Sequence, residues 1–564
     1  MIVCNLPLQA QPILDAPPPP LLPSETEIPF PSEPTGEILT IPSSGPEPQP
    51  KSSSELEDTL VSEDTIVVKS FKFEGNTAFS NRQLSDAVSA FVDRPLTFTE
   101  LLEARSAITN YYVSQGYITS GAYIAPQAIA DDTVTISIIE GSLESIEVEV
   151  EGKLSPDYVS DRIALAAGKP LNATKLLTAL QLLQINPLIA EISANLAASP
   201  HPGKSILNVS VISAPSFEAQ AILDNGRSPQ VGSVRRGIQL QDTNLTGWGD
   251  TLRGTYLNSD GSDDIDIAYN RPFNPHNGTL GIRFRSVTSD IIEEPLEQAD
   301  INSDYEKYEI QLRQPVIQTP QKELTLGISF DVQKSQSFLG LIPDAPFLVT
   351  SGTDNRGLTR VSTVRLFQEW LQRSDRQVLA ARSELDWGID AFGITESFDV
   401  DVNPNALNNR FFLWRGQFQW VYRFEADTLL VAVTDVQLAD RPVVSLERFA
   451  LGGLGSVRGY RQNTLLTDNG IFASVEMRLP VLRLPEQDSV LQIIPFADIG
   501  TGWNADGFNP MPSTLASVGL GLQWRYRDWL NARIDWGITL GRVPFEGDTL
   551  QDEGILFRVL IMPF

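Results

Sequence analysis

The stretch NARIDWGITLG, residues Asn531–Gly541, alternates between polar and apolar residues along most of its length. Its apolar positions are Ala532, Ile534, Trp536 and Ile538, and the positions between them are Asn531, Arg533, Asp535 and Gly537. Successive side chains of a β-strand point to opposite faces, so a period of two is the pattern of a strand. The stretch therefore predicts a strand with one apolar and one polar face.

The same alternation recurs through residues 215–564. About sixteen segments of strand length carry it, with approximate cores at 217–225, 235–243, 248–258, 264–270, 277–287, 305–315, 322–333, 357–370, 376–388, 410–424, 428–438, 470–480, 490–503, 515–526, 529–541 and 555–564. Single-chain barrels of the outer membrane have an even number of antiparallel strands and alternate in this way. We therefore expect an all-β transmembrane 16-stranded antiparallel barrel over residues 215–564.

The connections between these segments alternate in length. Short ones include Asn244–Gly247 and Arg527–Asp528, and long ones include Thr288–Asp304 and Lys334–Arg356. Outer-membrane barrels have short periplasmic turns and long outer loops, so the alternation also predicts the orientation. A soluble sandwich would alternate too, but the strand count and the loop lengths favour the barrel.

Composition excludes several classes of function. The chain has 564 residues, a formal net charge of −29, one cysteine and two histidines. Nucleic-acid binding needs a basic surface, and a disulfide framework, a zinc site or a Ser-His-Asp triad needs more cysteine or histidine than this. The sequence also has no P-loop pattern. We expect no metal, no cofactor, no nucleic-acid partner and no enzyme activity.

Residues 1–65 are rich in Pro, Ser and Glu, with four prolines in a row at Pro17–Pro20. Such a segment cannot bury a core, so we expect it to be extended or disordered. Its first residues fit either the tail of a signal peptide, ending at the small residue Ala10, or a plain disordered start.

Residues 66–214 contain an internal repeat. The stretch FKFEGNTAF (Phe71–Phe79) is echoed by VEVEGKLSP (Val148–Pro156), and RPLTFTELLEARSAI (Arg94–Ile108) is echoed by KPLNATKLLTALQLL (Lys169–Leu183). Each copy has the pattern of a strand, a glycine turn, two helices and two further strands. We therefore expect two small α+β domains, at 66–142 and 143–214.

A glycine-rich stretch, RFALGGLGSVRGYR (Arg448–Arg461), lies in the loop after the eleventh strand. Taken alone it fits a hairpin turn. If the loop enters the barrel, Arg458 needs a partner, because an unpaired buried charge is costly. Asp498 in PFADIGTGW (Pro495–Trp503) is the best candidate, since Gly500 on the same strand face leaves room for a chain to approach. The alternative is that Asp498 is one of many polar residues lining the lumen.

These two motifs resemble the hallmarks of two-partner secretion (type V) transporters of the haemolysin secretion/activation family, in the outer-membrane protein-assembly superfamily. The repeat at 66–214, with EGNTAF and SQGYITSGAYIAPQ (Ser114–Gln127), resembles that family's pair of polypeptide-transport-associated (POTRA) domains. The resemblance implies a sixth loop folded into the barrel. It also implies a set of site residues on the loop and the facing strand, namely Val457, Arg458, Gly459, Tyr460, Phe496, Asp498 and Gly500.

The resemblance further implies a function. The POTRA-like domains would hold an unfolded secreted partner in the periplasm, and the barrel, set in outer-membrane lipid, would export it. A barrel with a filled interior would work as a monomer. The chain departs from many members of the family at its start, where a Pro-rich segment stands in place of a plug helix.

Three other functions remain open from sequence. An assembly factor that inserts other barrels would share the superfamily barrel but usually has more than two tandem domains. A passive porin would explain neither the tandem domains nor the loop. A soluble glycosidase could use Glu384 and Asp386, but their shared strand face favours a role in lining the lumen.

Overall fold

The computed structural model describes residues 38–40, 65–128, 131–340, 345–346, 353–354, 356–393, 410–541 and 547–563. The chain folds as two compact units, one of residues 33–214 and one formed mainly by residues 215–564. The predicted Pro-rich segment, residues 1–65, lies outside the described residues except for Ile38–Thr40 and Thr65. No helix in the described ranges has the length and apolar character needed to cross a membrane.

The unit of residues 33–214 begins with a first α+β module. Its elements are β2 (Ile66–Val68), β3 (Ser70–Glu74), α1 (Asn81–Ala87), β4 (Arg94–Leu96), α2 (Phe98–Ser114), β5 (Gly121–Tyr123) and β6 (Thr133–Ile139). Helix α2 starts at a capping box, in which Thr97 and Glu100 bond each other's backbone amides. The apolar stripe of α2 packs on the sheet β3-β6-β5 and is buried.

The second module of this unit repeats the core order of the first, a strand, two helices and two strands, without counterparts of β2 and β4. Its elements are β7 (Ser142–Glu151), α3 (Pro156–Ala164), α4 (Ala173–Gln184), β8 (Ile189–Ala198) and β9 (Lys204–Ser213). The side chain of Asn172 caps α4 at its first turn. Leu176, Leu180 and Leu183 of α4 lie in the buried core of the module, as their helical spacing predicts.

One more strand belongs to this sheet and was not predicted. Leu39–Thr40 form β1, which pairs in parallel with β8, so that the sheet order is β1-β8-β9-β7. Composition did not predict this strand, because a strand of two residues leaves almost no periodicity in a Pro-rich sequence.

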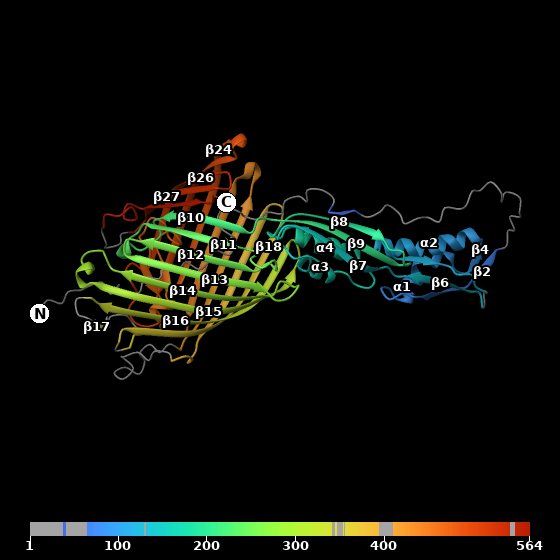
Figure 1. Cartoon of the computed structure of the whole chain (residues 1–564), viewed down its shortest axis with the longest axis horizontal. Coiled ribbons are helices and arrows are strands. Elements are labelled where there is room, and N and C mark those ends of the chain that lie inside the picture. Colours follow the sequence, from blue (N-terminus) through green and yellow to red (C-terminus); the bar gives the residue numbers. More distant parts are fainter. Residues whose placement is uncertain are drawn as a thin grey trace. The chain divides into compact units, whose positions relative to one another are not determined.

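The second unit is a closed antiparallel barrel (Figure 1). Across the described part of the chain, sixteen long strands form its wall: β10 (Phe217–Asp224), β11 (Arg235–Asp242), β12 (Thr251–Ser259), β13 (Ser262–Pro272), β14 (Thr279–Asp290), β15 (Ile301–Gln318), β16 (Lys322–Leu339), β18 (Leu358–Arg373), β19 (Gln377–Gly388), β20 (Phe412–Arg423), β21 (Leu429–Ala439), β24 (Asn469–Leu484), β25 (Ser489–Trp503), β26 (Thr514–Tyr526), β27 (Leu530–Thr539) and β28 (Ile555–Ile561). Strands β10 and β28 pair and close the ring. The predicted sixteen-stranded barrel is confirmed, and a two-residue strand, β17 (Ala345–Pro346), pairs with the end of β16.

The barrel is apolar outside and polar inside. On β27, Ile534, Trp536 and Ile538 are 46%, 55% and 48% exposed, whereas Arg533 and Asp535 are 8% and 1% exposed. This distribution is the reverse of a soluble protein's, and it fits a wall that faces lipid on one side and a lumen on the other.

The hairpin of β15 and β16 is longer than predicted. Both strands have 18 residues, because pairing continues to Ile301↔Leu339. The apolar alternation stops earlier, because Asn302–Asp304 and Lys334–Ser337 are polar on both faces. Backbone pairing needs only a partner strand, so the two strands extend past the apolar belt. The loops on either side, predicted at Thr288–Asp304 and Lys334–Arg356, are therefore shorter than expected.

Candidate functional site: the loop inside the barrel

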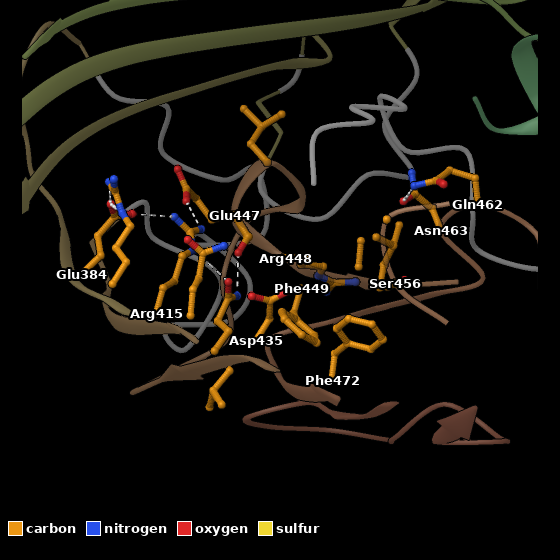
Figure 2. A pocket seen from close by; sticks show the side chains of 18 of the residues that line it. Glu384, Arg415, Asp435, Glu447, Arg448, Phe449, Ser456, Gln462, Asn463 and Phe472 are labelled. Carbon is orange, nitrogen blue, oxygen red and sulfur yellow. Dashed lines mark hydrogen bonds and ion pairs between the residues drawn. The ribbon is translucent and has the colours of Figure 1, made fainter. Parts of the chain in front are cut away.

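The loop between β21 and β24, residues 440–468, is the sixth of the predicted outer loops. It contains a short hairpin of its own, in which β22 (Phe449–Leu451) pairs with β23 (Leu465–Thr467). Its side chains line a large cavity of the barrel interior (Figure 2). The loop thus turns inward instead of extending outward.

An apolar cluster fastens the loop to the inside of the wall. Its buried members are Leu451, Val457, Tyr460 and Leu465 of the loop and Phe472 and Leu515 of the wall. The hydroxyl of Tyr460 donates a hydrogen bond to the carbonyl oxygen of Ala516, at 3.0 Å. The burial of such a cluster favours the docked position of the loop.

The loop approaches the wall closely at two glycines. Gly459 has φ +92°, and a Cβ atom on it would stand 2.8 Å from the carbonyl oxygen of Gly537 on β27. A Cβ atom on Gly500 of β25 would stand 2.6 Å from Cδ2 of Leu451 and 3.1 Å from Cγ2 of Val457. A side chain at Gly459 would meet the backbone of Gly537 and force the loop away from β27, whereas a side chain at Gly500 would meet only side-chain ends of the loop, which can shift.

Arg458 directly precedes Gly459, and its side chain is almost fully buried, with 6% of the residue exposed. Its Nε donates to Oδ2 of Asp498 at 2.8 Å, and its Nη2 donates to Oδ1 of Asp498 at 2.9 Å, which is a bidentate pair. The backbone N–H of Arg458 also donates to Oδ2 of Asp498, at 3.1 Å. The guanidinium carbon lies 3.6 Å from the centre of the Phe496 ring, in a cation–π contact.

A second carboxylate shares the arginine. Nη1 of Arg458 donates to Oε2 of Glu476 on β24, at 2.9 Å. Glu476 also accepts from Arg533 and Arg478, and Arg533 pairs with Asp535. The three arginines and the three carboxylates, including Asp498, balance in formal charge. Arg458 therefore completes a neutral network, and its removal would leave buried carboxylates in excess.

A separate ion cluster holds the start of the loop. Glu447, in the 3₁₀ turn Ser445–Glu447, is 2% exposed. Its carboxylate accepts from Nη2 of Arg365 at 2.8 Å, from Nη2 of Arg415 at 2.6 Å and from Nε2 of Gln333 at 2.7 Å. These partners come from β16, β18 and β20, whereas Arg458 is held by β24 and β25. The loop thus has two charged anchors on different sectors of the wall.

Arg461, which follows Tyr460, contacts two other loops of the barrel. Arg461 pairs with Asp552 at 2.5 Å and with Glu293 at 2.8 Å. Glu293 lies between β14 and β15 and Asp552 lies between β27 and β28, so the loop inside the barrel is also tied by charge to two other loops.

Beside the loop the interior contains a cavity of about 1780 Å³. Arg415, Glu447 and Arg448 line it, together with the loop residues Phe449, Ser456 and Gln462 (Figure 2). Among the described residues, no cluster of three or more His, Cys, Asp or Glu has the arrangement of a metal site. Glu384 and Asp386 also face this interior, where they pair with Arg382 and Arg415.

The structure brings together all seven residues that the sequence singled out: Val457, Arg458, Gly459, Tyr460, Phe496, Asp498 and Gly500. Sequence reasoning missed Glu476, Gly537 and the Glu447 cluster. Glu476 and Gly537 stood on predicted polar faces, but alternation does not tell which polar residues meet across the lumen. Glu447 directly precedes the glycine-rich stretch Arg448–Arg461, and this position was the only signal in the sequence that it helps to hold the loop.

Comparison with protein families gives two matches. A family model described as haemolysin secretion/activation protein ShlB/FhaC/HecB matches residues 203–524, more than half of the chain. A model described as POTRA domain, ShlB-type, matches residues 66–141.

Curated relatives cover most of the chain. The heme/hemopexin transporter protein HuxB of Haemophilus influenzae strain 86-028NP is 23% identical over 469 residues, which cover 78% of this chain and 78% of the relative. The outer membrane transporter CdiB of Dickeya dadantii strain 3937 is 18% identical over 464 residues, covering 80% and 78%.

Solved structures share the fold. CdiB from Escherichia coli matches with a TM-score of 0.67 at 17% identity, covering 92% of this chain and 93% of that one. BamA from Haemophilus ducreyi lacking POTRA domains 1–3 matches with a TM-score of 0.53 at 14% identity, covering 88% and 100%.

Proposed function

We propose a gating mechanism for this chain, which belongs to the family of haemolysin secretion/activation proteins. Members of this family are two-partner secretion transporters, so the chain is an outer-membrane channel that exports a secreted partner protein. The barrel lies in the outer membrane, and the POTRA module lies in the periplasm. The family, fold, export function and location expected from sequence are confirmed.

The loop of residues 440–468 is the gate in this proposal. The observation that carries it is the bidentate pair between Arg458 and Asp498 deep in a lumen that an exported chain must cross. An extended chain needs a free passage, and the loop with its apolar cluster occupies part of the available width. Export therefore requires the loop to leave its docked position.

The two anchors make the gate a two-state element. Arg458 and Glu447 are almost fully buried and their charges are paired, so an intermediate position would leave buried charges without partners. Packed interfaces of this kind switch between discrete arrangements instead of deforming continuously. The docked loop closes the channel, and an arriving partner shifts the population towards the undocked state.

The two α+β modules receive the partner while it is unfolded. The second module, residues 143–214, shares with the matched POTRA module a core of one strand, two helices and two further strands, and we assign it the same role. Strand edges bind extended segments through backbone hydrogen bonds, which suits a channel whose cargo has not folded. The loop fills part of the barrel from within the same chain, which favours a working monomer.

A reversible staple tests the gate. The Cβ position of Gly500 lies 3.1 Å from Cγ2 of Val457, so Val457→Cys with Gly500→Cys places two thiols in reach of each other. The variants are expressed in a deletion strain, and the secreted and outer-membrane proteomes are measured with and without a reductant. We expect the oxidised protein to block export of one or a few large proteins and the reductant to restore it.

The two single cysteine variants serve as controls, because each carries one of the substitutions without the crosslink. Export by the oxidised double variant at the level of the reduced one would refute gating by this loop. A general fall of outer-membrane barrels in the deletion strain would instead indicate an assembly factor.

A further inference from the structure

The segment Ile38–Thr40 lies along the outer edge of the second module's sheet. It runs parallel to β8, with Leu39 opposite Ala194 and Thr40 opposite Asn195. The N–H of Ala194 donates to the carbonyl oxygen of Ile38, at 2.9 Å. A piece of the Pro-rich N-terminal region thus takes the place of a fourth strand.

The three side chains of this segment differ in how deeply they are buried. Ile38 is 6% exposed and is part of the buried core of the module, and Leu39 packs partly against that core. Thr40 is exposed. The edge therefore offers backbone hydrogen bonds together with a place for one aliphatic side chain and part of a second.

The two edges of the sheet differ in charge. The edge strand β7 carries Glu147, Glu149 and Glu151 at exposed positions, and such charges discourage a further strand. Opposite and beside the paired part of β8 the exposed residues are Ser193 and Asn195, which are small and neutral, and the one exposed charge on this strand is Glu191. The β8 edge is thus better suited than the β7 edge to accept an added strand.

We propose that the outer edge of β8 is a binding site for an extended, aliphatic segment of the secreted partner, running parallel to β8, and that Ile38–Thr40 occupies this site in the resting chain. The identity of the displacing ligand rests on the export function proposed above. The site itself rests on the pairing and burial of Ile38–Thr40.

The resting occupant is built to be displaced. It forms two residue pairs with β8, whereas β9 pairs along nearly the whole length of β8 on the other side. The sequence places Pro42 two residues beyond Thr40, and proline has no N–H to donate. A longer segment of the partner forms more backbone hydrogen bonds along β8 than Ile38–Thr40 does.

A peptide of residues 33–44, EPTGEILTIPSS, is the direct probe. It is labelled with a fluorophore and titrated into the full chain in nanodiscs, as wild type and as Ile38→Asp. If the chain's own segment occupies the edge at least nine-tenths of the time, we expect the variant to bind the peptide about 10-fold more tightly than the wild type. The exchange rate of the Ala194 amide should rise in the variant and fall again when the peptide is added.

Two controls exclude general effects. Leu177→Asp makes the same kind of change on the exposed side of α4 and should leave peptide affinity at the wild-type level. A peptide with Asp in place of Ile38 should not bind the Ile38→Asp protein. Equal affinity of wild type and Ile38→Asp for the native peptide, with an unchanged Ala194 exchange rate, would overturn the assignment of the edge.

The partner is tested in exporting cells. A photo-crosslinking residue at position 195 should capture the secreted partner during export, and capture should increase with Ile38→Asp. Crosslinks confined to residues 33–44 of the chain itself would overturn the displacement by the partner. Peptide binding requires no gate, so failure of the loop staple and failure of the edge site are distinguishable results.

Discussion

Gly459 of the loop and Gly537 of β27 are in backbone contact inside the barrel, with room for no side chain on either residue. A Cβ atom on Gly537 would stand 2.6 Å from the nitrogen of Gly459, and the reciprocal distance to the Gly537 carbonyl oxygen is 2.8 Å. This contact sets how closely Arg458 approaches the wall, because Arg458 directly precedes Gly459.

Gly537→Ala should therefore undock the loop while the barrel remains inserted. We expect a higher ion conductance in planar bilayers, because the added methyl group pushes the loop tip away from β27 and the undocked loop no longer closes the channel. The check is conductance together with heat-modifiable migration of the barrel on a gel. Gly254→Ala is the matched control, since a Cβ atom there meets nothing within 4 Å; equal conductance of the two variants would contradict the prediction.

Arg458→Ala should lower the stability of the docked loop and raise the ion conductance of the channel. Breaking a buried, hydrogen-bonded ion pair typically costs about 3–5 kcal/mol, because the remaining carboxylates of Asp498 and Glu476 stay buried. Arg458→Lys should raise the conductance less, because lysine keeps the charge but not the bidentate geometry. Thermal unfolding of the purified barrel and conductance in planar bilayers measure the two effects, and wild-type conductance of a well-inserted Arg458→Ala protein would refute the gate.

Glu447→Gln should loosen the other anchor. The change removes one charge and leaves Arg365 and Arg415 facing a neutral amide, so we expect higher and noisier ion conductance in planar bilayers. Glu323→Gln is the control, because Glu323 lines the same interior but bonds Thr325 of its own strand and not the loop. A conductance trace of Glu447→Gln indistinguishable from that of Glu323→Gln would show that Glu447 does not hold the gate.

The first module should lose stability in acid through Glu140. Burial alone would raise the pKa of Glu140, but hydrogen bonds from the backbone of Ala78 and Thr77 and from the hydroxyls of Thr77 and Tyr112 hold it below its ordinary value of 4.5. The depressed pKa stabilises the folded module above pH 4.5, and this contribution is lost as the pH falls through the lower, folded value.

Hydrogen exchange in the full chain measures this effect. The amides of Thr77 and Ala78, which donate to Glu140 at 2.7 and 2.8 Å, should lose protection below about pH 4.5 after correction for intrinsic rates. In Glu140→Gln they should exchange faster at neutral pH and show little further change in acid. Protection of wild type that is unaffected by acid would contradict the prediction.

The sequence predicted the wall of the barrel better than its interior. Alternation in stretches such as Asn531–Gly541 places each residue on one of two faces, and that suffices to count strands and to orient them. It does not give the stagger between strands, which decides that Glu476 reaches Arg458 or that Gly537 meets Gly459. Asp498 was found because a glycine beside a carboxylate on one face signals a close approach.

The strand Leu39–Thr40 illustrates a different limit. Its pairing depends on a free edge about 155 residues further along the chain, Leu39 being opposite Ala194. Local composition, which is dominated by proline, favours no regular structure. Tertiary context decides in such a case, and no local pattern carries that information.

The apolar cluster around Val457 also has a consequence for the order in which the protein folds. Its members span only Val433 to Leu515, whereas the ring is closed by β10 and β28 from the two ends of the barrel sequence. Contacts between residues close in sequence form early, because they lose little chain entropy. We expect the loop and strands β21 to β26 to assemble first, so that the wall curves around a loop already in place. The loop would then act as a template for the barrel before it acts as its gate.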